Sequence, residues 1–346
     1  MLKPLKFALS AALLAATAGL TTAPSAPVRA DEVEWKMHAI FVPAREESQA
    51  YQRWADRVSE RAEGKLNVTY YPGGQLGIKD VDLLRILPQG NVIQAAGLVA
   101  NYLSRDAPEL ANLLPPGIME DETKFVELLP MLHDMFQEIY DKWGVKLLTL
   151  MMAPNHTIEI FCREPINTLE ELRRVKVRVW EKAQVETFAK LGVSASIIPQ
   201  ADLYVAMQTG VVDCATYLSG FATTISLQEV APHFAFITPY ALHPHSIIVS
   251  QRAWDALPPD VQAILQEEAD RTREEMNEKF LDASWEEEQL QLLLAAGGKQ
   301  LEPFPEADRR AYFEAAREAG RDLAEQAGPE AVQNYEAIIQ AMDQQS

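Results

Sequence analysis

The chain has 346 residues and carries 31 basic against 50 acidic side chains, which gives a formal charge of −19 at pH 7. So acidic a protein is poorly suited to bind nucleic acid or an anionic membrane surface, because both would repel it. Its length suits two domains. Any anion-binding role would have to rest on a local cation that overrides the global charge.

The first thirty residues have the pattern of a secretory signal. Lys3 and Lys6 precede an apolar run from Phe7 to Leu20, and small residues lead up to Ala30. This pattern predicts export to the periplasm and cleavage after Ala30. The alternative, a membrane anchor, needs about 20 apolar residues, and this run is shorter. Cleavage would leave 346 − 30 = 316 residues and remove three basic groups, so the charge becomes −19 − 3 = −22. We expect no membrane insertion after cleavage.

The start of the mature chain alternates strands with helices. The predicted elements are a strand over Glu34–Ile40, a helix over Arg45–Ala62, a strand over Leu66–Tyr71, a helix over Asp80–Leu87 and a strand over Val92–Leu98. Such alternation predicts parallel strands with right-handed crossovers. His38 lies at the carboxyl end of the first strand, where it either faces a cleft or is a solvent-facing loop residue.

A polar break separates the next two strands. A helix over Glu122–Trp143 leads into a strand over Val145–Met151, and Asn155-His156 then interrupts before a strand over Thr157–Cys162. The break either carries the chain from one domain to the other or is an ordinary β-turn with asparagine in a left-handed conformation.

A second alternating unit runs from Asn167 to Tyr217. Thr168 is placed to cap a short helix, and Gly192 and Gly210 are placed to end later ones. Ligands of such sheets bind outside the carboxyl ends of the strands, so residues there form the candidate site. They are Arg178, Trp180, Gln200 and Tyr217. The predicted elements after the short helix are Lys176–Val179 (strand), Glu181–Leu191 (helix), Ser194–Ile198 (strand), Asp202–Thr209 (helix) and Val211–Ala215 (strand).

Arg178 is a cation on an otherwise apolar strand, between Val177 and Val179. Its structural explanation is an ion pair with an acid such as Asp213 or Glu181. Its functional explanation is a bidentate fork for the carboxylate of a ligand.

Helices dominate the last third of the chain. A helix from Asp260 to about Ala296 would exceed 30 residues and about 45 Å, so we expect it to lie along both domains. A final helix is expected over Glu306–Ala327, followed by a fraying tail. Shorter elements before them are Phe221–Leu227 (helix), Phe234–Thr238 (strand) and Ser246–Ser250 (strand).

The sequence contains no phosphate-binding glycine loop, nucleophile elbow, paired-histidine helix or cysteine metal knuckle. His243-Pro-His245 lacks a third ligand at useful spacing, so we expect neither cofactor nor metal. Cys162 and Cys214 lie on predicted strands; a disulfide and two buried thiols both remain open. A rival hypothesis is a secreted enzyme that uses His38, Asp213 or His156 as acid or base.

Several of these segments resemble the solute-binding proteins of tripartite ATP-independent periplasmic (TRAP) transporters. They are Tyr70-Tyr-Pro-Gly-Gly-Gln-Leu-Gly77, Lys176-Val-Arg-Val179, Leu191-Gly192 and Asp202-Leu-Tyr-Val-Ala-Met-Gln-Thr-Gly-Val-Val-Asp213. The resemblance implies a two-lobed α/β fold that closes on an organic anion and delivers it to a membrane permease. It also implies that Arg178 grips the carboxylate, that His38 and Asn155 join the ligand site, and that no covalent chemistry occurs. A receptor for a sensor kinase is an alternative role for the same fold.

The chain departs from the family pattern at several pocket positions. Ile158 replaces a second arginine, Tyr217 an asparagine, and Trp180 a proline, while Leu98 falls near a glutamate of sialic-acid-binding members. Each change removes polarity or adds a ring. We therefore expect a monocarboxylate with an apolar or aromatic body, stacked on Trp180 or Tyr217; packing between the domains is the other explanation for these rings. The predicted domains are residues 31–154 with approximately 243–284, and residues 155–242 with approximately 285–346.

Overall fold

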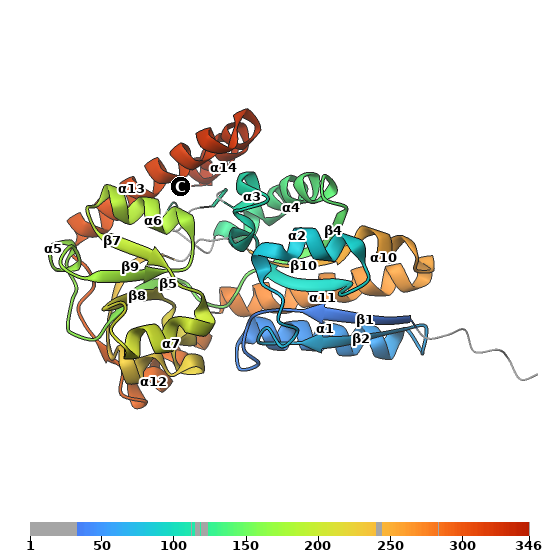
Figure 1. Cartoon of the computed structure of the whole chain (residues 1–346), viewed down its shortest axis with the longest axis horizontal. Coiled ribbons are helices and arrows are strands. Elements are labelled where there is room, and N and C mark those ends of the chain that lie inside the picture. The colour runs from blue at the N-terminus through green and yellow to red at the C-terminus, as the bar shows by residue number, and fades with distance from the viewer. Residues whose placement is uncertain are drawn as a thin grey trace, which may run out of the picture. The chain divides into compact units, whose positions relative to one another are not determined.

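Two mixed β-sheets with helices around them make up the part of the chain that the structure describes. The structure is a computed structural model, and it describes residues 33–345 except 112, 115–117, 119–123, 240–243 and 283. The predicted signal segment lies outside this range, so export stays a prediction. We call the first sheet with its helices the first lobe and the second sheet with its helices the second lobe (Figure 1).

The first lobe is built on a five-stranded sheet in the order β2-β1-β3-β10-β4. β1 pairs in parallel with β2 and β3, as the alternating pattern predicts, whereas β10 is antiparallel to both of its neighbours. Every residue of β3 and β10 is buried, because helices cover both faces of the sheet at these central strands. The strands are β1 (Val33–His38), β2 (Leu66–Tyr71), β3 (Ala95–Val99), β4 (Val145–Met151) and β10 (His245–Ser250).

Three long helices cover the first sheet. α1 (Glu46–Arg61) packs on β2, and α11 (Pro259–Leu281) packs on both α1 and β4. α4 (Phe125–Asp141) also packs on β4. Trp54 shows how closely α1 and α11 meet: its side chain is fully buried, and its indole Nε1 donates to the carbonyl oxygen of Leu265 at 3.3 Å.

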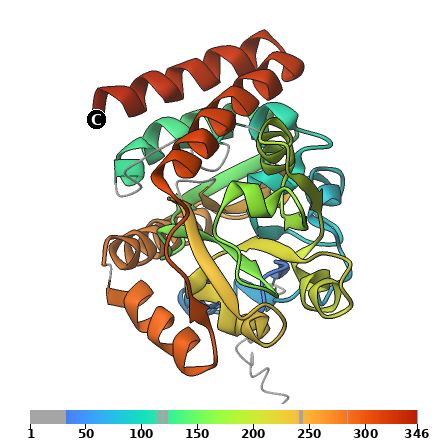
Figure 2. The same cartoon turned by 90° about the vertical axis from the view of Figure 1, so that its left-hand side faces the viewer.

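The second lobe is built on a six-stranded sheet in the order β11-β9-β5-β8-β6-β7. β6 is parallel to β7 and β8, which is the pairing expected of the unit from Asn167 to Tyr217. Thr168 caps its helix as predicted, since its side chain accepts from the backbone N–H of Glu171. Figure 2 shows this sheet beneath the red C-terminal helices. The strands are β5 (Thr157–Cys162), β6 (Lys176–Val179), β7 (Ser194–Ile197), β8 (Cys214–Tyr217), β9 (His233–Pro239) and β11 (Lys299–Gln300).

The remaining helices are short or lie at the C-terminus. In the first lobe they are η1 (Asp80–Asp82), α2 (Leu83–Ile86), η2 (Leu87–Gln89), η3 (Ala100–Leu103), α3 (Pro108–Ala111) and α10 (Gln251–Asp255). Beside the second sheet they are α5 (Leu169–Leu172), α6 (Lys182–Lys190), α7 (Gln200–Gln208), α8 (Ser219–Ala222), η5 (Thr223–Ile225), α9 (Leu227–Val230), α12 (Ser284–Ala295), α13 (Glu306–Ala327) and α14 (Pro329–Gln345).

The chain passes between the two sheets at the polar break after β4. β4 belongs to the first sheet and β5 to the second, so Asn155-His156 marks a crossing rather than a turn within one sheet. Asn155 is buried there, where its Oδ1 accepts from Gly220 N at 3.0 Å and its Nδ2 donates to Thr157 O at 2.6 Å. These bonds fix the crossing to the second lobe.

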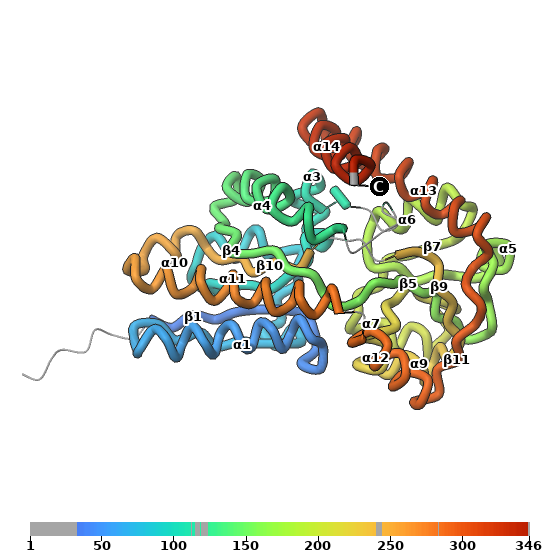
Figure 3. The backbone as a smooth tube through the Cα atoms, turned by 180° about the vertical axis from the view of Figure 1, so that it is seen from behind, coloured from blue at the N-terminus to red at the C-terminus, as the bar shows by residue number. Residues whose placement is uncertain are grey.

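Two expectations for the C-terminal part were wrong in detail. The helix expected from Asp260 to about Ala296 is divided into α11 and α12, because Asp282 is extended and its Oδ1 accepts from Ser284 N at 3.0 Å, which starts a new helix. Together the two helices still run from the first lobe to the second (Figure 3). The tail expected to fray forms α14 up to Gln345.

Cys162 and Cys214 form a disulfide, which resolves the alternative that the sequence left open. They face one another on the antiparallel strands β5 and β8. The bond ties the strand that enters the second lobe to the strand that ends at Tyr217.

Within the described residues, no helix is long and apolar enough to cross a membrane. The same part of the chain holds no cluster of three or more potential metal ligands. His243 of the His-Pro-His stretch lies outside the described residues.

Candidate functional site

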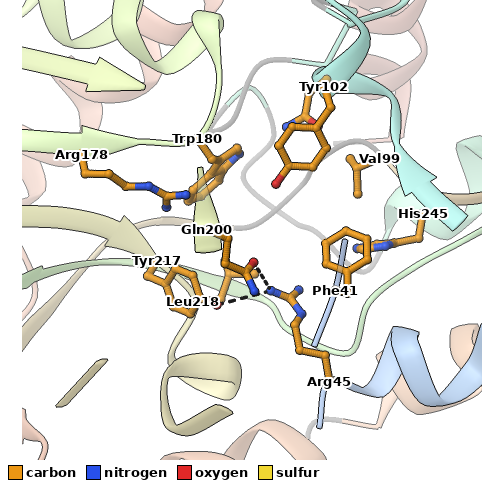
Figure 4. A pocket seen from close by; sticks show the side chains of 11 residues that line it. Phe41, Arg45, Val99, Tyr102, Arg178, Trp180, Gln200, Tyr217, Leu218 and His245 are labelled. Carbon is orange, nitrogen blue, oxygen red and sulfur yellow. Dashed lines mark hydrogen bonds between the residues drawn. The ribbon is translucent and has the colours of Figure 1, made fainter. Parts of the chain in front are cut away.

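A small cavity of about 40 Å³ lies between the two sheets and is lined from both lobes (Figure 4). Four of the six predicted site residues line it, namely Arg178, Trp180, Gln200 and Tyr217. Leu218 completes the wall from the second lobe. The first lobe contributes Phe41, Arg45, Val99, Asn101, Tyr102 and His245.

Strand ends explain why these side chains meet. Tyr217 is the last residue of β8, Val99 is the last of β3, and Trp180 directly follows β6. His245 begins β10, which is antiparallel to β3, so its first residue lies at the same edge as the end of β3. The cavity is therefore placed where parallel α/β sheets generally bind their ligands.

Arg178 is held in the cavity wall by backbone carbonyls. Its side chain is 1% exposed, with Nε donating to Ile198 O at 2.8 Å and Nη1 to Thr216 O at 3.2 Å. Among the described residues it forms no salt bridge, and the predicted alternative partner Asp213 instead accepts from the backbone N–H of Lys176. Burial lowers the pKa of Arg178. A guanidinium nevertheless keeps its proton at neutral pH, so Arg178 is a cation in the cavity wall to which the described part of the chain supplies no salt-bridge partner.

Two aromatic rings accompany this cation. The Arg178 guanidinium carbon lies 5.9 Å from the centroid of the Trp180 ring, close enough for a cation–π contact. Trp180 is half-buried, whereas Tyr217 is 3% exposed and packs edge-on against Phe161 at 6.4 Å. Tyr217 is thus both a cavity residue and part of the core of the second lobe.

Arg45 is a second buried arginine in the wall, and it is not among the site residues predicted from the sequence. It precedes α1 in the first lobe, yet its Nη1 donates to Gln200 Oε1 at 3.2 Å and to Tyr217 Oη at 3.5 Å, both in the second lobe. Its guanidinium also stacks on Phe221 at 4.0 Å. The available signal was its position at the end of the loop between β1 and α1, because this loop follows the carboxyl end of a strand.

Asn101 makes a further contact between the lobes. Its Nδ2 donates to Glu181 Oε2 at 2.9 Å. Burial raises the pKa of Glu181 to about 8, although the hydrogen bonds from Asn101 and Trp180 oppose the shift. This carboxyl is therefore mostly neutral at pH 7.

The other two predicted residues lie apart from the cavity lining. His38 is fully buried, and its Nε2 lies 3.1 Å from Asp80 Oδ1. Asn155 holds the crossing between the sheets. Neither is among the eleven lining residues, so their roles as ligand contacts stay predictions. The residues of the enzyme hypothesis (His38, Asp213 and His156) are likewise absent from this lining.

Comparison with known proteins gives a family match over most of the chain. Residues 42–327 match the model for DctP, described as bacterial extracellular solute-binding protein, family 7. The C4-dicarboxylate-binding periplasmic protein DctP of Rhodobacter capsulatus is 24% identical over 335 residues, which cover 93% of this chain and 95% of that protein.

Solved TRAP periplasmic solute-binding proteins share the fold. One from Chromohalobacter salexigens with bound D-glucuronate has a TM-score of 0.78 and 19% identity, covering 89% of this chain and 99% of that chain. One from Desulfovibrio salexigens with bound orotic acid has a TM-score of 0.77 and 21% identity, with the same coverage. These likenesses confirm the expected two-lobed α/β architecture.

Proposed function

The chain belongs to the bacterial extracellular solute-binding proteins of family 7, and from this premise we propose that it captures an organic acid for a TRAP transporter. The observation that carries the proposal is Arg178, a buried cation in the wall of a cavity between two lobes, whose hydrogen-bond partners among the described residues are backbone carbonyls. An uncompensated buried charge is costly, and a ligand carboxylate would supply the missing counter-ion.

The ligand that fits this wall is a monocarboxylate with an apolar or aromatic body. Trp180, Tyr102 and Phe41 offer ring faces, and Val99 and Leu218 offer aliphatic surface. Orotic acid and D-glucuronate, bound in the two structural relatives, each carry one carboxyl group, whereas the Rhodobacter relative is named for dicarboxylates. The relatives therefore leave the ligand class to be decided by the residues of this cavity.

Capture proceeds by closure of the two lobes. Contacts from Arg45 and Asn101 to the opposite lobe hold the cavity shut and exclude water from the bound carboxylate. The closed form then presents its surface to the membrane permease, and nothing covalent happens to the ligand. In this scheme residues 1–30 export the protein to the periplasm, and the lobes consist of 31–154 with approximately 243–284, and 155–242 with approximately 285–346.

A thermal-shift screen of the ligand-stripped mature protein tests this function. We expect aromatic and aliphatic carboxylic acids to raise the melting temperature, and a ligand at 100 times its Kd to add about 2.7 kcal/mol of stability. The matched alcohol or methyl ester of each acid is the control, because it keeps the body and removes the charge. A panel in which no acid stabilises the protein, or in which the esters do so equally, would refute the proposed function.

A further inference from the structure

Arg45 gives the cavity a second buried cation, from the first lobe, whereas Arg178 comes from the second. It is 4% exposed, and it lines the cavity from the first lobe while its Nη1 reaches Gln200 and Tyr217 of the second. Two arginines in one small cavity would ordinarily favour a ligand with two carboxylates, one for each guanidinium.

Glu47 changes this expectation. It lies two residues further along, in the first turn of α1, and is fully buried. It forms an ion pair with the Nη2 atom of Arg45, and it is not among the residues that line the cavity. Burial by itself would raise the pKa of Glu47, but Arg45 and His245 outweigh it, and the pKa is lowered. Glu47 is therefore ionised and neutralises Arg45 without itself lining the cavity.

The other polar groups at this end add no charge. His245 Nε2 lies 3.6 Å from Glu47 Oε1, and its Nδ1 lies 3.4 Å from the hydroxyl oxygen of Tyr51. Burial lowers the pKa of His245 to about 4, so the ring is neutral at pH 7. Asn101 and Tyr102, also in the wall, are uncharged.

The two lobes therefore bring different net charges to the cavity: about +1 from Arg178 in the second lobe, and zero from Arg45 with Glu47 in the first. We propose that Glu47 is a specificity-determining residue, a built-in counter-ion for Arg45 that makes the cavity accept one carboxylate and reject a second. This inference rests on the proposed function and specifies its ligand class: an acid with one carboxylate, whose other end is neutral.

The physical reason is desolvation. A second carboxylate would lose its water on entering the cavity, and that loss is recovered only if an uncompensated cation receives it. Arg45 already pairs with the carboxylate of Glu47. The second carboxylate of a ligand would have to share the same guanidinium, and Glu47 would repel it. A neutral hydroxyl, carbonyl or ring faces no such penalty.

Glu47→Gln tests the proposal, because glutamine keeps the shape and removes the counter-ion. Calorimetric titration would compare pairs of acids on one carbon skeleton, butanoate with succinate and 2-methylbenzoate with phthalate. We expect the wild-type protein to prefer the monocarboxylate of a pair, and Glu47→Gln to shift the ratio of dissociation constants by about tenfold or more toward the dicarboxylate. Glu46→Gln is the matched control: it makes the same charge change one residue away, but Glu46 pairs with Arg53 and Lys279 at 3.1 and 2.9 Å.

A folded Glu47→Gln protein with an unchanged ratio would overturn the inference, and so would a wild-type protein that binds both acids of a pair equally. If Glu47→Gln does not fold, the double variant Arg45→Gln with Glu47→Gln replaces it, since it removes both charges together. The double variant should keep the wild-type preference for the monocarboxylate of each pair. A preference for the dicarboxylate would contradict the proposal. A wild-type protein that binds no acid at all would instead refute the proposed function.

Discussion

The two buried arginines that line the cavity differ in the partners that the protein gives them. Arg178 in the second lobe has backbone carbonyls, and Arg45 in the first lobe has a buried carboxylate. Burial and residue type are nearly the same, so neither property distinguishes Arg178, the proposed ligand contact, from the ion-paired Arg45. The separating property is whether the protein itself supplies the counter-charge.

This contrast predicts that removing Arg45 mainly damages stability. In Arg45→Met the carboxylate of Glu47 stays buried without its cation, and breaking such a pair typically costs about 3–5 kcal/mol. Urea unfolding of the ligand-free protein measures the loss. The double variant Arg45→Met with Glu47→Leu should recover most of it, and a double variant as unstable as the single one would show that the pair is not the cause.

Removing Arg178 should instead weaken ligand binding and leave the stability of the ligand-free protein intact. Arg178→Met leaves no buried carboxylate behind, so the free energy of unfolding of the ligand-free protein should be unchanged or higher. The loss should appear in binding, at about 2–5 kcal/mol or roughly 30-fold to several thousand-fold in Kd. Titration with the best acid of the screen measures it, with the exposed Arg174→Met as the control. An affinity within threefold of wild type would remove Arg178 from the site.

The buried glutamate three positions after Arg178 in the sequence adds a pH-dependent test. Burial raises the pKa of Glu181 from 4.5 to about 8. The folded state therefore holds this proton more tightly than the unfolded chain, and its stabilising effect is present below pH 4.5 and lost as pH rises toward 8, at up to about 1.4 kcal/mol per pH unit. Glu181→Gln should flatten that part of the profile in urea unfolding at several pH values.

Glu159 provides the control for this measurement, because burial raises its pKa as well, to about 7. The stability that protonated Glu159 contributes is lost over a lower pH range than that of Glu181. This loss should persist in the Glu181→Gln protein. A profile with the same slope between pH 7 and 8 in both proteins would mean that Glu181 is already ionised.

Trp180 should give the smallest effect. A ring that stacks on the ligand contributes about 0.5–1.5 kcal/mol beyond area burial, so Trp180→Ala should weaken aromatic acids several-fold more than aliphatic ones. Titration with benzoate and butanoate measures the difference. Equal losses would assign the ring to packing between the lobes and leave Arg178 as the main determinant at that end.

Much of the architecture could be predicted from the sequence, because it depends on local patterns of apolar and polar residues. Alternating strands and helices gave the parallel pairings of β1 with β2 and β3 and of β6 with β7 and β8. The strand-end rule placed Arg178, Trp180, Gln200 and Tyr217 in one wall. The break at Asp282 was missed because the apolar spacing continues across it, while the capping bond to Ser284 depends on one side-chain rotamer.

The first-lobe residues that line the candidate site could not be predicted from local sequence patterns. Arg45 and Tyr217 are 172 positions apart, and only the tertiary fold brings them together. Glu46 and Glu47 look alike in the sequence, as two acids in the first turn of a helix, where negative charge is generally favourable. In the structure they point to different partners, since Glu46 pairs with Arg53 and Glu47 with Arg45.

The C-terminal helices constrain how far the lobes can separate. α13 packs on α6 of the second lobe, where Lys190 Nζ lies 2.7 Å from Asp322 Oδ2, and α14 packs on α3 and α4 of the first. Lys142, just after α4, pairs with Glu330 of α14 at 2.6 Å. The two helices thus connect the second lobe to the first. In the proposed closure, a wide opening of the lobes would have to detach α14 from α3 and α4, whereas a small rotation about the crossing strands would leave these contacts in place, so we expect the lobes to move over a narrow range.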